Sequence, residues 1–309
     1  MPADLPIEDH IERLLLLPRS EQLAASRRLL ADRTAPLPEA WNTTFGPHSL
    51  FDAWCRTTVA RQVHQGIRDV VLPRLTPGFV LVEVGGGDGA TWKGHLHVPG
   101  TLVVVDPVPE VHERVRAAVP RFVDVVAIEA PVEEATLPDA DVLVCSLTLH
   151  HVAGRDAAER AIHGLAGPGK REVLESFARC LAGRDGVGVL VEADVDCEVD
   201  LPPGDPALED HIFDSYVRRC ARSIVTDVRE RGPAEDADLV GRWRALLRHW
   251  FLGQLAVVDV PIAERDVYEL TVPRWLALLA AAGLQVDSHD FVDGLPLFHR
   301  YVFRGTHPT

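Results

Sequence analysis

The sequence Val80-Leu-Val-Glu-Val-Gly-Gly-Gly-Asp-Gly-Ala90 joins an apolar run to four glycines and an aspartate. A short apolar run that ends in glycines predicts a buried parallel strand that turns sharply over a ligand. Glycine suits such a turn because a residue without Cβ adopts positive φ and lets the backbone come close to a bound molecule. Glu83 lies two residues before the first glycine, so its carboxylate bears on which ligand the turn can accept.

Two kinds of nucleotide-binding loop fit these glycines. The spacing Gly85-x-Gly87-x-x-Ala90 matches the dinucleotide fingerprint, in which a helix N-terminus receives a pyrophosphate. The spacing Glu83-x-Gly85-x-Gly87-x-Gly89 is similar to the first motif of class I S-adenosylmethionine (SAM) methyltransferases. A carboxylate in the loop would repel a pyrophosphate but attract the cationic amino group of a methionine moiety. The loop therefore favours SAM over NAD.

Composition limits the class of protein. The chain has 309 residues, of which 47% are hydrophobic, enough for one large domain or one domain with an appendage. No apolar run approaches the ~20 residues of a membrane span and no secretory pattern opens the chain, so we expect a cytoplasmic protein that does not bind membrane. The formal charge is −15, with 46 acidic and 31 basic residues. An acidic chain without a basic stripe argues against nucleic acid as a partner and favours a small-molecule substrate.

The five cysteines form no Cys-x-x-Cys pair, which disfavours both a disulfide framework and a zinc-cysteine site. Lysine is rare, since Lys93 and Lys170 are the two lysines of the chain. This arginine-rich, lysine-poor composition suggests a bacterial chain from a GC-rich genome.

Residues 1–78 are expected to form a helical segment separate from the sheet that follows. Residues 7–30 have helical spacing interrupted at Pro18, which predicts two short helices. Ser49 is expected to cap a further helix that runs to about Leu72. A segment of this size could form a homodimer contact or a lid.

Beyond the glycine loop, strand and helix patterns alternate, which predicts a parallel sheet with helices on both faces. A short helix is expected at residues 90–97. The next two strands, residues 101–105 and 123–128, end on Asp106 and Glu129. A strand-end carboxylate can accept both hydroxyl protons of a ribose diol, or a proton of an adenine amino group.

The fourth strand begins after Asp141 and is expected to end in the paired histidines of Leu149-His150-His151-Val152. The fifth strand delivers Glu192 and Asp194 to the same edge of the sheet. Open α/β sheets bind their ligands at this carboxyl edge.

Together these motifs resemble class I SAM-dependent methyltransferases, and the Leu-His-His-Val ending is similar to a subgroup with many small-molecule and ubiquinone-type enzymes. The resemblance implies an enzyme with a Rossmann-like seven-stranded sheet, mostly parallel and closed by an antiparallel hairpin. It implies SAM as the cofactor and methyl transfer to a small molecule through O, N or C, in bacterial specialised biosynthesis. The cofactor-binding residues that it implies are Glu83, Gly85, Gly87, Gly89, Asp106, Pro107, Glu129, Ala130, Ser146, Leu147 and His150.

The methyltransferase domain is expected to span residues 79–309, with a helical lid insertion at about residues 195–260. A polar stretch at residues 153–169 departs from the family pattern. Aromatic residues in the insertion suit an apolar or aromatic acceptor, although their helical spacing favours core packing between lid and sheet over substrate contact.

Methyl transfer is an in-line displacement at a sulfonium methyl, so it requires no metal, and it requires a base only for an acceptor that arrives protonated. The candidate bases are His150, His151, Glu192, Asp194 and His211, and we favour His151 followed by His211 because histidine titrates near neutrality. No metal site is expected, since adjacent histidines on a strand point to opposite sides.

Two alternatives remain open. By resemblance, some relatives convert the aminobutyrate chain of SAM itself and release methylthioadenosine. The chain could also be a nucleotide-binding homologue without methyl transfer, either NAD-linked or catalytically silent. The two final strands, expected near residues 284–288 and 298–303 as an antiparallel hairpin, weigh against NAD.

Overall fold

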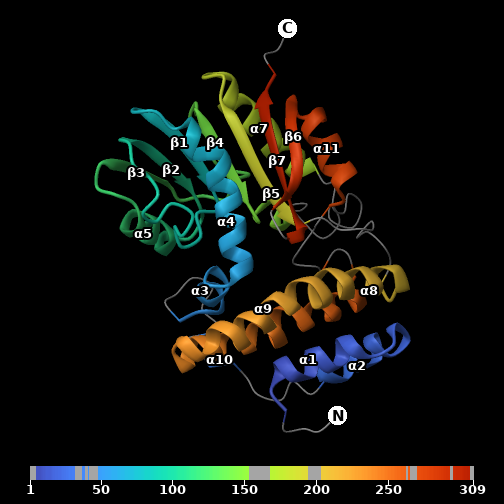
Figure 1. Ribbon diagram of the computed structural model, residues 1–309. Coiled ribbons are helices and arrows are strands. Elements are labelled where there is room, and N and C mark those ends of the chain that lie inside the picture. Colours follow the sequence, from blue (N-terminus) through green and yellow to red (C-terminus); the bar gives the residue numbers. More distant parts are fainter. Residues whose placement is uncertain are drawn as a thin grey trace. The chain divides into compact units, whose positions relative to one another are not determined.

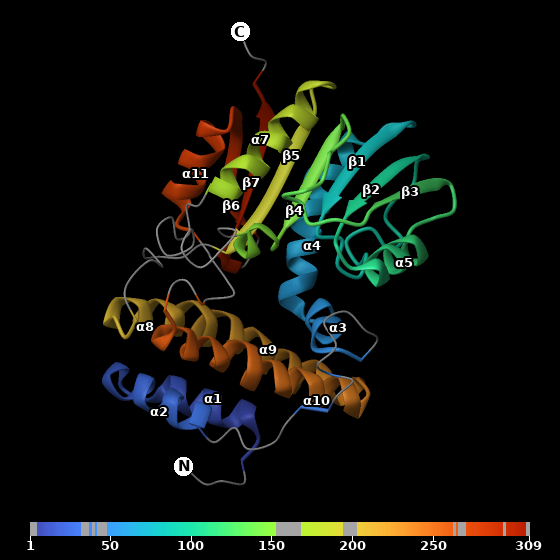
Figure 2. The same cartoon turned by 180° about the vertical axis from the view of Figure 1, so that it is seen from behind.

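The computed structural model separates the chain into two units (Figures 1 and 2). The helical unit comprises Met1–Arg61 and Leu201–Pro261, and the sheet unit comprises Gln62–Asp200 and Ile262–Thr309. Within them the structure describes residues 5–31, 37–38, 41, 48–152, 168–193, 203–261, 264, 270–292 and 295–306. The polar stretch at residues 153–167, together with Asp194, lies outside this part of the chain.

The sheet unit contains the seven strands that the sequence predicts. Their order is β3-β2-β1-β4-β5-β7-β6, with β1 to β5 parallel and β7 antiparallel to both of its neighbours. The predicted fold class and its closing hairpin are therefore confirmed. The strands are β1 (Phe79–Val84), β2 (Gly100–Val105), β3 (Val123–Ile128), β4 (Val142–Ser146), β5 (Val187–Ala193), β6 (Leu284–Val292) and β7 (Leu295–Gly305).

Helices lie on both faces of this sheet, with α4 on one face and α7 and α11 on the other (Figures 1 and 2). Strands covered on both faces read as continuous apolar runs, and the side chains of Leu81, Val82 and Val84 in β1 are accordingly almost fully buried. The helices are α4 (Thr58–Val71), α5 (Pro109–Ala118), α7 (Pro168–Ala182) and α11 (Val272–Ala281).

The short helix expected at residues 90–97 is absent, and this prediction was wrong. Residues 85–99, all of which the structure describes, form turns instead. Gly94 adopts a φ of 75°, which a right-handed helix cannot contain, and His95 N donates to Trp92 O at 2.9 Å to close a single turn. No helix therefore begins at the end of the glycine loop.

The helical unit begins with two helices that flank Pro18, as predicted, because proline cannot continue a helix. Ser49 caps the third helix, since its Oγ accepts from Asp52 N at 3.0 Å. Among the described residues, no helix combines the length and hydrophobicity that a membrane span requires. The helices are α1 (Ile7–Leu16), α2 (Arg19–Ala31), α3 (Leu50–Cys55), α8 (Pro206–Ile212), α9 (Arg222–Thr226) and α10 (Ala237–Leu246), with π-helical segments at Phe213–Ala221, Asp227–Arg231 and Leu247–Phe251.

The helix predicted from Ser49 to about Leu72 is broken after α3, where Thr57 caps a new helix and a buried carboxylate binds its first residue. Asp227 accepts hydrogen bonds from Thr58 N at 2.7 Å and from Thr58 Oγ1 at 2.6 Å. Thr57 caps the new helix, since its Oγ1 accepts from Ala60 N at 3.2 Å, so α4 begins at Thr58.

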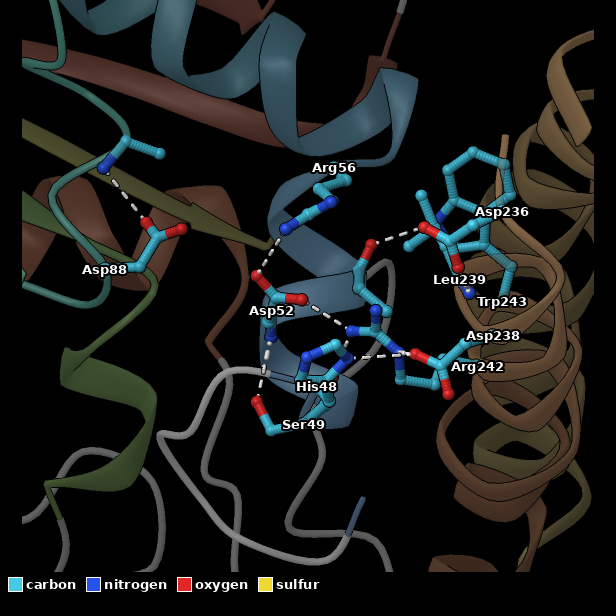
Figure 3. Close-up of polar contacts among 12 residues, drawn as sticks. His48, Ser49, Asp52, Arg56, Asp88, Asp236, Asp238, Leu239, Arg242 and Trp243 are labelled. Atoms are coloured by element: carbon cyan, nitrogen blue, oxygen red, sulfur yellow. Dashed lines mark hydrogen bonds and ion pairs between the residues drawn. The ribbon is translucent and has the colours of Figure 1, made fainter. Parts of the chain in front are cut away.

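A buried arginine connects α3 to α10 within the helical unit (Figure 3). Arg242 is 1% exposed, and its guanidinium donates to Asp52 Oδ2 at 2.5 Å, to Asp238 Oδ2 at 3.0 Å and to Ser49 O at 3.2 Å. The neighbouring Trp243 indole N–H donates to a backbone carbonyl of α3 at 3.0 Å. The charge of Arg242 is thus compensated inside the unit by two carboxylates.

Replacing Arg242 by methionine should lower the free energy of unfolding by about 3 kcal/mol, because the partly buried Asp52 carboxylate loses its buried partner and keeps only the exposed Arg56. Guanidinium chloride titration would measure the change. The control is Arg171→Met, which breaks the exposed pair with Glu175 and should cost less than about 1 kcal/mol. Equal losses in the two variants would contradict the role assigned to Arg242.

Candidate active site

The glycine turn after β1 is left-handed at three positions. Gly85, Gly87 and Gly89 have φ values of 75°, 57° and 73°. A Cβ built on Gly85 would lie 2.1 Å from Thr148 Oγ1, which is closer than two atoms can approach. Glycine is therefore required at Gly85 both by backbone conformation, as predicted, and by the space that the Thr148 side chain takes, which was not predicted.

Glu83 places a buried carboxyl group directly before this turn. It is 4% exposed, and its Oε2 has no hydrogen-bond partner among the described residues. Burial raises the pKa of Glu83 to about 8, the Trp92 indole opposes this shift, and the negative charges of Asp88 and Asp106 add to it. Asp88 itself accepts from the Ala90 backbone N–H at 2.9 Å (Figure 3). A buried acid with an unused oxygen suits a cationic group of a ligand.

The dinucleotide interpretation of the loop fails on geometry. A pyrophosphate is bound at a helix N-terminus, and no helix follows Gly89 in the described residues 85–99. The charge argument is weaker than the sequence indicated, because a pKa of about 8 leaves Glu83 mostly protonated at pH 7. A neutral Glu83 would not repel a phosphate, so the missing helix is the stronger evidence against NAD.

Strand register places the other predicted cofactor residues beside this turn. Val84 pairs with Val105, and Val105 pairs with Ile128, so the residues that follow these three positions share one edge of the sheet. Gly85 N donates to Val105 O at 2.9 Å and Asp106 N donates to Ile128 O at 3.2 Å, which continues the ladder to that edge.

Asp106 is the more enclosed of the two strand-end acids. It is 5% exposed, and its Oδ1 accepts from Val108 N at 2.9 Å. Burial raises the pKa of Asp106, while the Val108 N–H, His112 and the Gly86 N–H lower it. The side chain is thus held in one orientation, as a bidentate ribose contact requires.

Pro107, Glu129 and Ala130, which the sequence also predicts to bind the cofactor, lie at the same edge of the sheet but are less enclosed than Asp106. Pro107 follows Asp106 directly before α5, and Glu129 is exposed at the end of β3. Ala130 N donates to Ile128 O at 3.0 Å, which turns the chain immediately after Glu129.

The paired histidines lie on a 3₁₀ turn (Leu149–His151) rather than on the strand, so that part of the prediction was wrong. β4 ends at Ser146, and Leu147 adopts a φ of 50°, which turns the chain away from the strand direction. The rings of His150 and His151 are consequently 4.2 Å apart between centroids and do not point to opposite sides. The described residues nevertheless contain no group of three or more metal-ligating side chains.

Glu192, from the end of β5, holds this turn. Its Oε1 accepts from Thr148 N at 3.0 Å and from Leu149 N at 2.7 Å, and its Oε2 lies 2.8 Å from His150 Nδ1. The Glu192 side chain is 1% exposed and that of His150 is 14% exposed. Sequence patterns had suggested Glu192 only as a candidate base, whereas the structure shows it as the anchor of the histidine turn.

Three further groups near the site carried no recognisable sequence signal. Buried Lys170 donates its Nζ proton to Val152 O and fastens the end of the histidine turn. Arg68 of α4 donates to Thr91 O at 3.1 Å, beyond the glycine loop. Burial lowers the pKa of His64 to about 4, with Asp88 opposing and Arg68 reinforcing the shift, so this imidazole is neutral at pH 7.

The two histidines favoured as bases belong to different units. His151 is exposed in the sheet unit. His211 is buried in the helical unit, with its Nδ1 3.3 Å from Ser215 Oγ. Their roles in catalysis therefore stay predictions.

Part of the chain matches the model of a known protein family. Residues 82–174 match the family model described as a methyltransferase domain, a span that runs from β1 into α7 and includes the glycine turn, Asp106 and the histidine turn. No curated protein matches the chain.

Solved structures include distant methyltransferases. The CMeT domain of the citrinin polyketide synthase is 14% identical, with a TM-score of 0.48 over 99% of this chain and 71% of that one. Human N-acetylserotonin methyltransferase is 17% identical, with a TM-score of 0.46 over 93% and 66%. The N-methyltransferase NodS from Bradyrhizobium japonicum is 13% identical, with a TM-score of 0.46 over 82% and 99%. Likenesses this low carry no information about the acceptor.

The matched family and the residues at the strand ends both indicate binding of SAM. Three left-handed glycines, an enclosed strand-end carboxylate and a buried acid with an unused oxygen fit the ribose and the amino group of SAM. The chain therefore carries a class I SAM-dependent methyltransferase domain and is an enzyme for which SAM is the methyl donor.

Proposed function

We propose that this enzyme transfers the methyl group of SAM to a small-molecule acceptor, through O, N or C, in bacterial specialised biosynthesis. The observation that carries the proposal is the row of strand ends at one edge of the sheet, where Glu83, the glycine turn and Asp106 lie in register. The acidic chain supports a small molecule over nucleic acid. Membership of the Leu-His-His-Val subgroup stays a prediction.

Each residue of the row has one role in this proposal. Glu83 pairs with the cationic amino group of SAM, and Asp106 accepts the two ribose hydroxyls. Glu129 and Ala130 lie beside the adenine, and the residues from Ser146 through Leu147 line the methionine side. When bound, SAM supplies an electrophilic methyl group on a sulfonium.

The acceptor is proposed to be apolar in part, because the sequence between residues 195 and 260 is rich in aromatic residues. Trp54 lies 6.4 Å from Trp250 and 6.0 Å from Phe251 between ring centroids, and both tryptophans are only half-buried. The lid at residues 195–260, the boundary at residue 78 and the homodimer contact remain predictions.

Calorimetric titration with S-adenosylhomocysteine (SAH) and, separately, with NAD is the direct test. Tight binding of SAH alone supports the proposal, and binding of NAD alone would contradict it. Incubation with SAM then identifies the reaction, since methyl transfer releases SAH whereas conversion of the aminobutyrate chain releases methylthioadenosine.

Asp106→Ala should weaken SAH binding by at least ~1.5 kcal/mol, or more than tenfold in Kd, because a charged hydrogen bond to the ribose is lost. Calorimetry measures the change, and circular dichroism confirms the fold. Asp124→Ala removes an exposed carboxylate from β3 and should leave the Kd within twofold. Unchanged affinity in Asp106→Ala would remove this residue from the site.

Glu83→Gln should stabilise the ligand-free protein increasingly as pH rises. A buried acid with a raised pKa gives stability at low pH that is lost as pH rises from its unfolded value, near 4.5, to about 8. The variant lacks this loss, so its advantage over wild type should grow by up to ~3 kcal/mol between pH 4.5 and pH 7. Denaturant titration at both pH values measures the difference.

The same variant should bind SAH at least tenfold more weakly, because Glu83 can lose its proton to pair with the ammonium group of the ligand, whereas an amide cannot become charged. A variant that is more stable and also binds SAH normally would show that Glu83 is buried without contacting the ligand.

A further inference from the structure

Glu192 orients the imidazole ring of His150. Glu192 Oε2 lies 2.8 Å from His150 Nδ1, and the second oxygen of Glu192 accepts from the N–H groups of Thr148 and Leu149. Two N–H donors on one oxygen suit an ionised carboxylate. An ionised carboxylate has no proton to donate, so in its contact with His150 it can only accept a hydrogen bond. The proton of a neutral His150 therefore resides on Nδ1, which makes Nε2 the basic nitrogen.

Such an arrangement is more than a structural anchor. Two backbone bonds to Oε1 would suffice to hold the turn, whereas the contact through Oε2 fixes a tautomer and stabilises the imidazolium that forms on protonation. The His150 side chain is 14% exposed, so the ring is largely shielded from solvent.

Several titratable groups surround the pair. The ring of His151 lies 4.2 Å from that of His150 between centroids, and Cys145 lies near Glu192 with a thiol pKa that burial keeps well above its usual range. On β7, His299 occupies the position directly across from Glu192, and its ring lies 4.4 Å from that of Phe291.

We infer that His150, oriented by Glu192, is the general base of the reaction and that the acceptor is a weakly acidic hydroxyl, of the phenol or enol class. This inference rests on the proposed function and assigns the base to His150 in place of His151 and His211. An imidazole is matched to such hydroxyls because their acidity lies within a few pKa units of its own, whereas an aliphatic alcohol is too weak an acid.

The step balances in atoms and charge. The acceptor O–H bond breaks and its proton moves to His150 Nε2, while the oxygen forms a bond to the methyl carbon. The carbon–sulfur bond breaks and its electron pair stays on sulfur, which gives a methyl ether and SAH. Glu192 stabilises the resulting imidazolium, which then returns its proton to solvent.

A first experiment requires no acceptor. In protein labelled with ¹⁵N-histidine, long-range ¹H–¹⁵N spectra at pH 8 should show His150 with its proton on Nδ1, assigned by the loss of its signals in His150→Gln. Glu192→Gln keeps an oxygen for the Thr148 and Leu149 N–H groups but presents an amide N–H to His150, so the proton should move to Nε2. An Nε2–H tautomer in the wild-type protein would overturn the inference.

A second experiment uses methyl-labelled SAM with phenol and with 4-nitrophenol, whose hydroxyl is ionised near neutral pH. His150→Gln and Glu192→Gln should each lower kcat on phenol by 10² to 10⁴-fold, but kcat on 4-nitrophenol by less than tenfold, because that acceptor needs no base. A merely structural role for the pair would lower both rates equally, and that outcome overturns the inference. So would a larger loss in His151→Gln, or the absence of methyl transfer to either phenol.

SAH titration of the wild-type protein and both variants separates the two levels of the proposal. Wild-type protein that fails to bind SAH refutes the proposed function itself. Normal SAH affinity in all three proteins, together with equal rates on phenol, refutes only the assignment of His150.

Discussion

Hydrogen bonding in register between β1 and its two neighbours is the constraint on which the site depends. Because Val84 pairs with both Val105 and Cys145, the residues that follow these three strands must meet at one edge. Parallel strands all present their carboxyl ends in the same direction, so residues more than sixty positions apart converge there without any contact designed for that purpose. The glycine turn then only has to lack side chains that would fill the space for a ligand at the carboxyl edge of the sheet.

The sequence predicted what depends on strand order and backbone conformation. Gly85, Gly89 and Asp106 were identified because positive φ and a strand-end acid leave a signature in residue type and spacing. The glycine turn and the strand-end acid are local features, which a single sequence can show. The closing hairpin was expected from the resemblance to a known family instead.

The features that sequence could not predict depend on tertiary contacts. Residues 90–97 look helical, but Gly94 adopts a left-handed conformation there, and nothing local shows this preference over a helix. Glu192 looked like one acid among several, and its role became visible only when the backbone N–H groups of a turn 43 and 44 residues away proved to be its partners. The pKa of His64, lowered to about 4, likewise follows from burial.

The rarity of lysine leaves this enzyme with few side-chain amines that a reagent could modify. Of its two lysines, Lys170 is buried with its amine bound to a backbone carbonyl, and Lys93 is exposed in the turns that follow the glycine loop. An amine-reactive fluorophore would therefore find one accessible side chain, a few residues from the place where the cofactor is proposed to lie. The chain is therefore suited to labelling at one lysine side chain, with no second exposed lysine to remove by mutation.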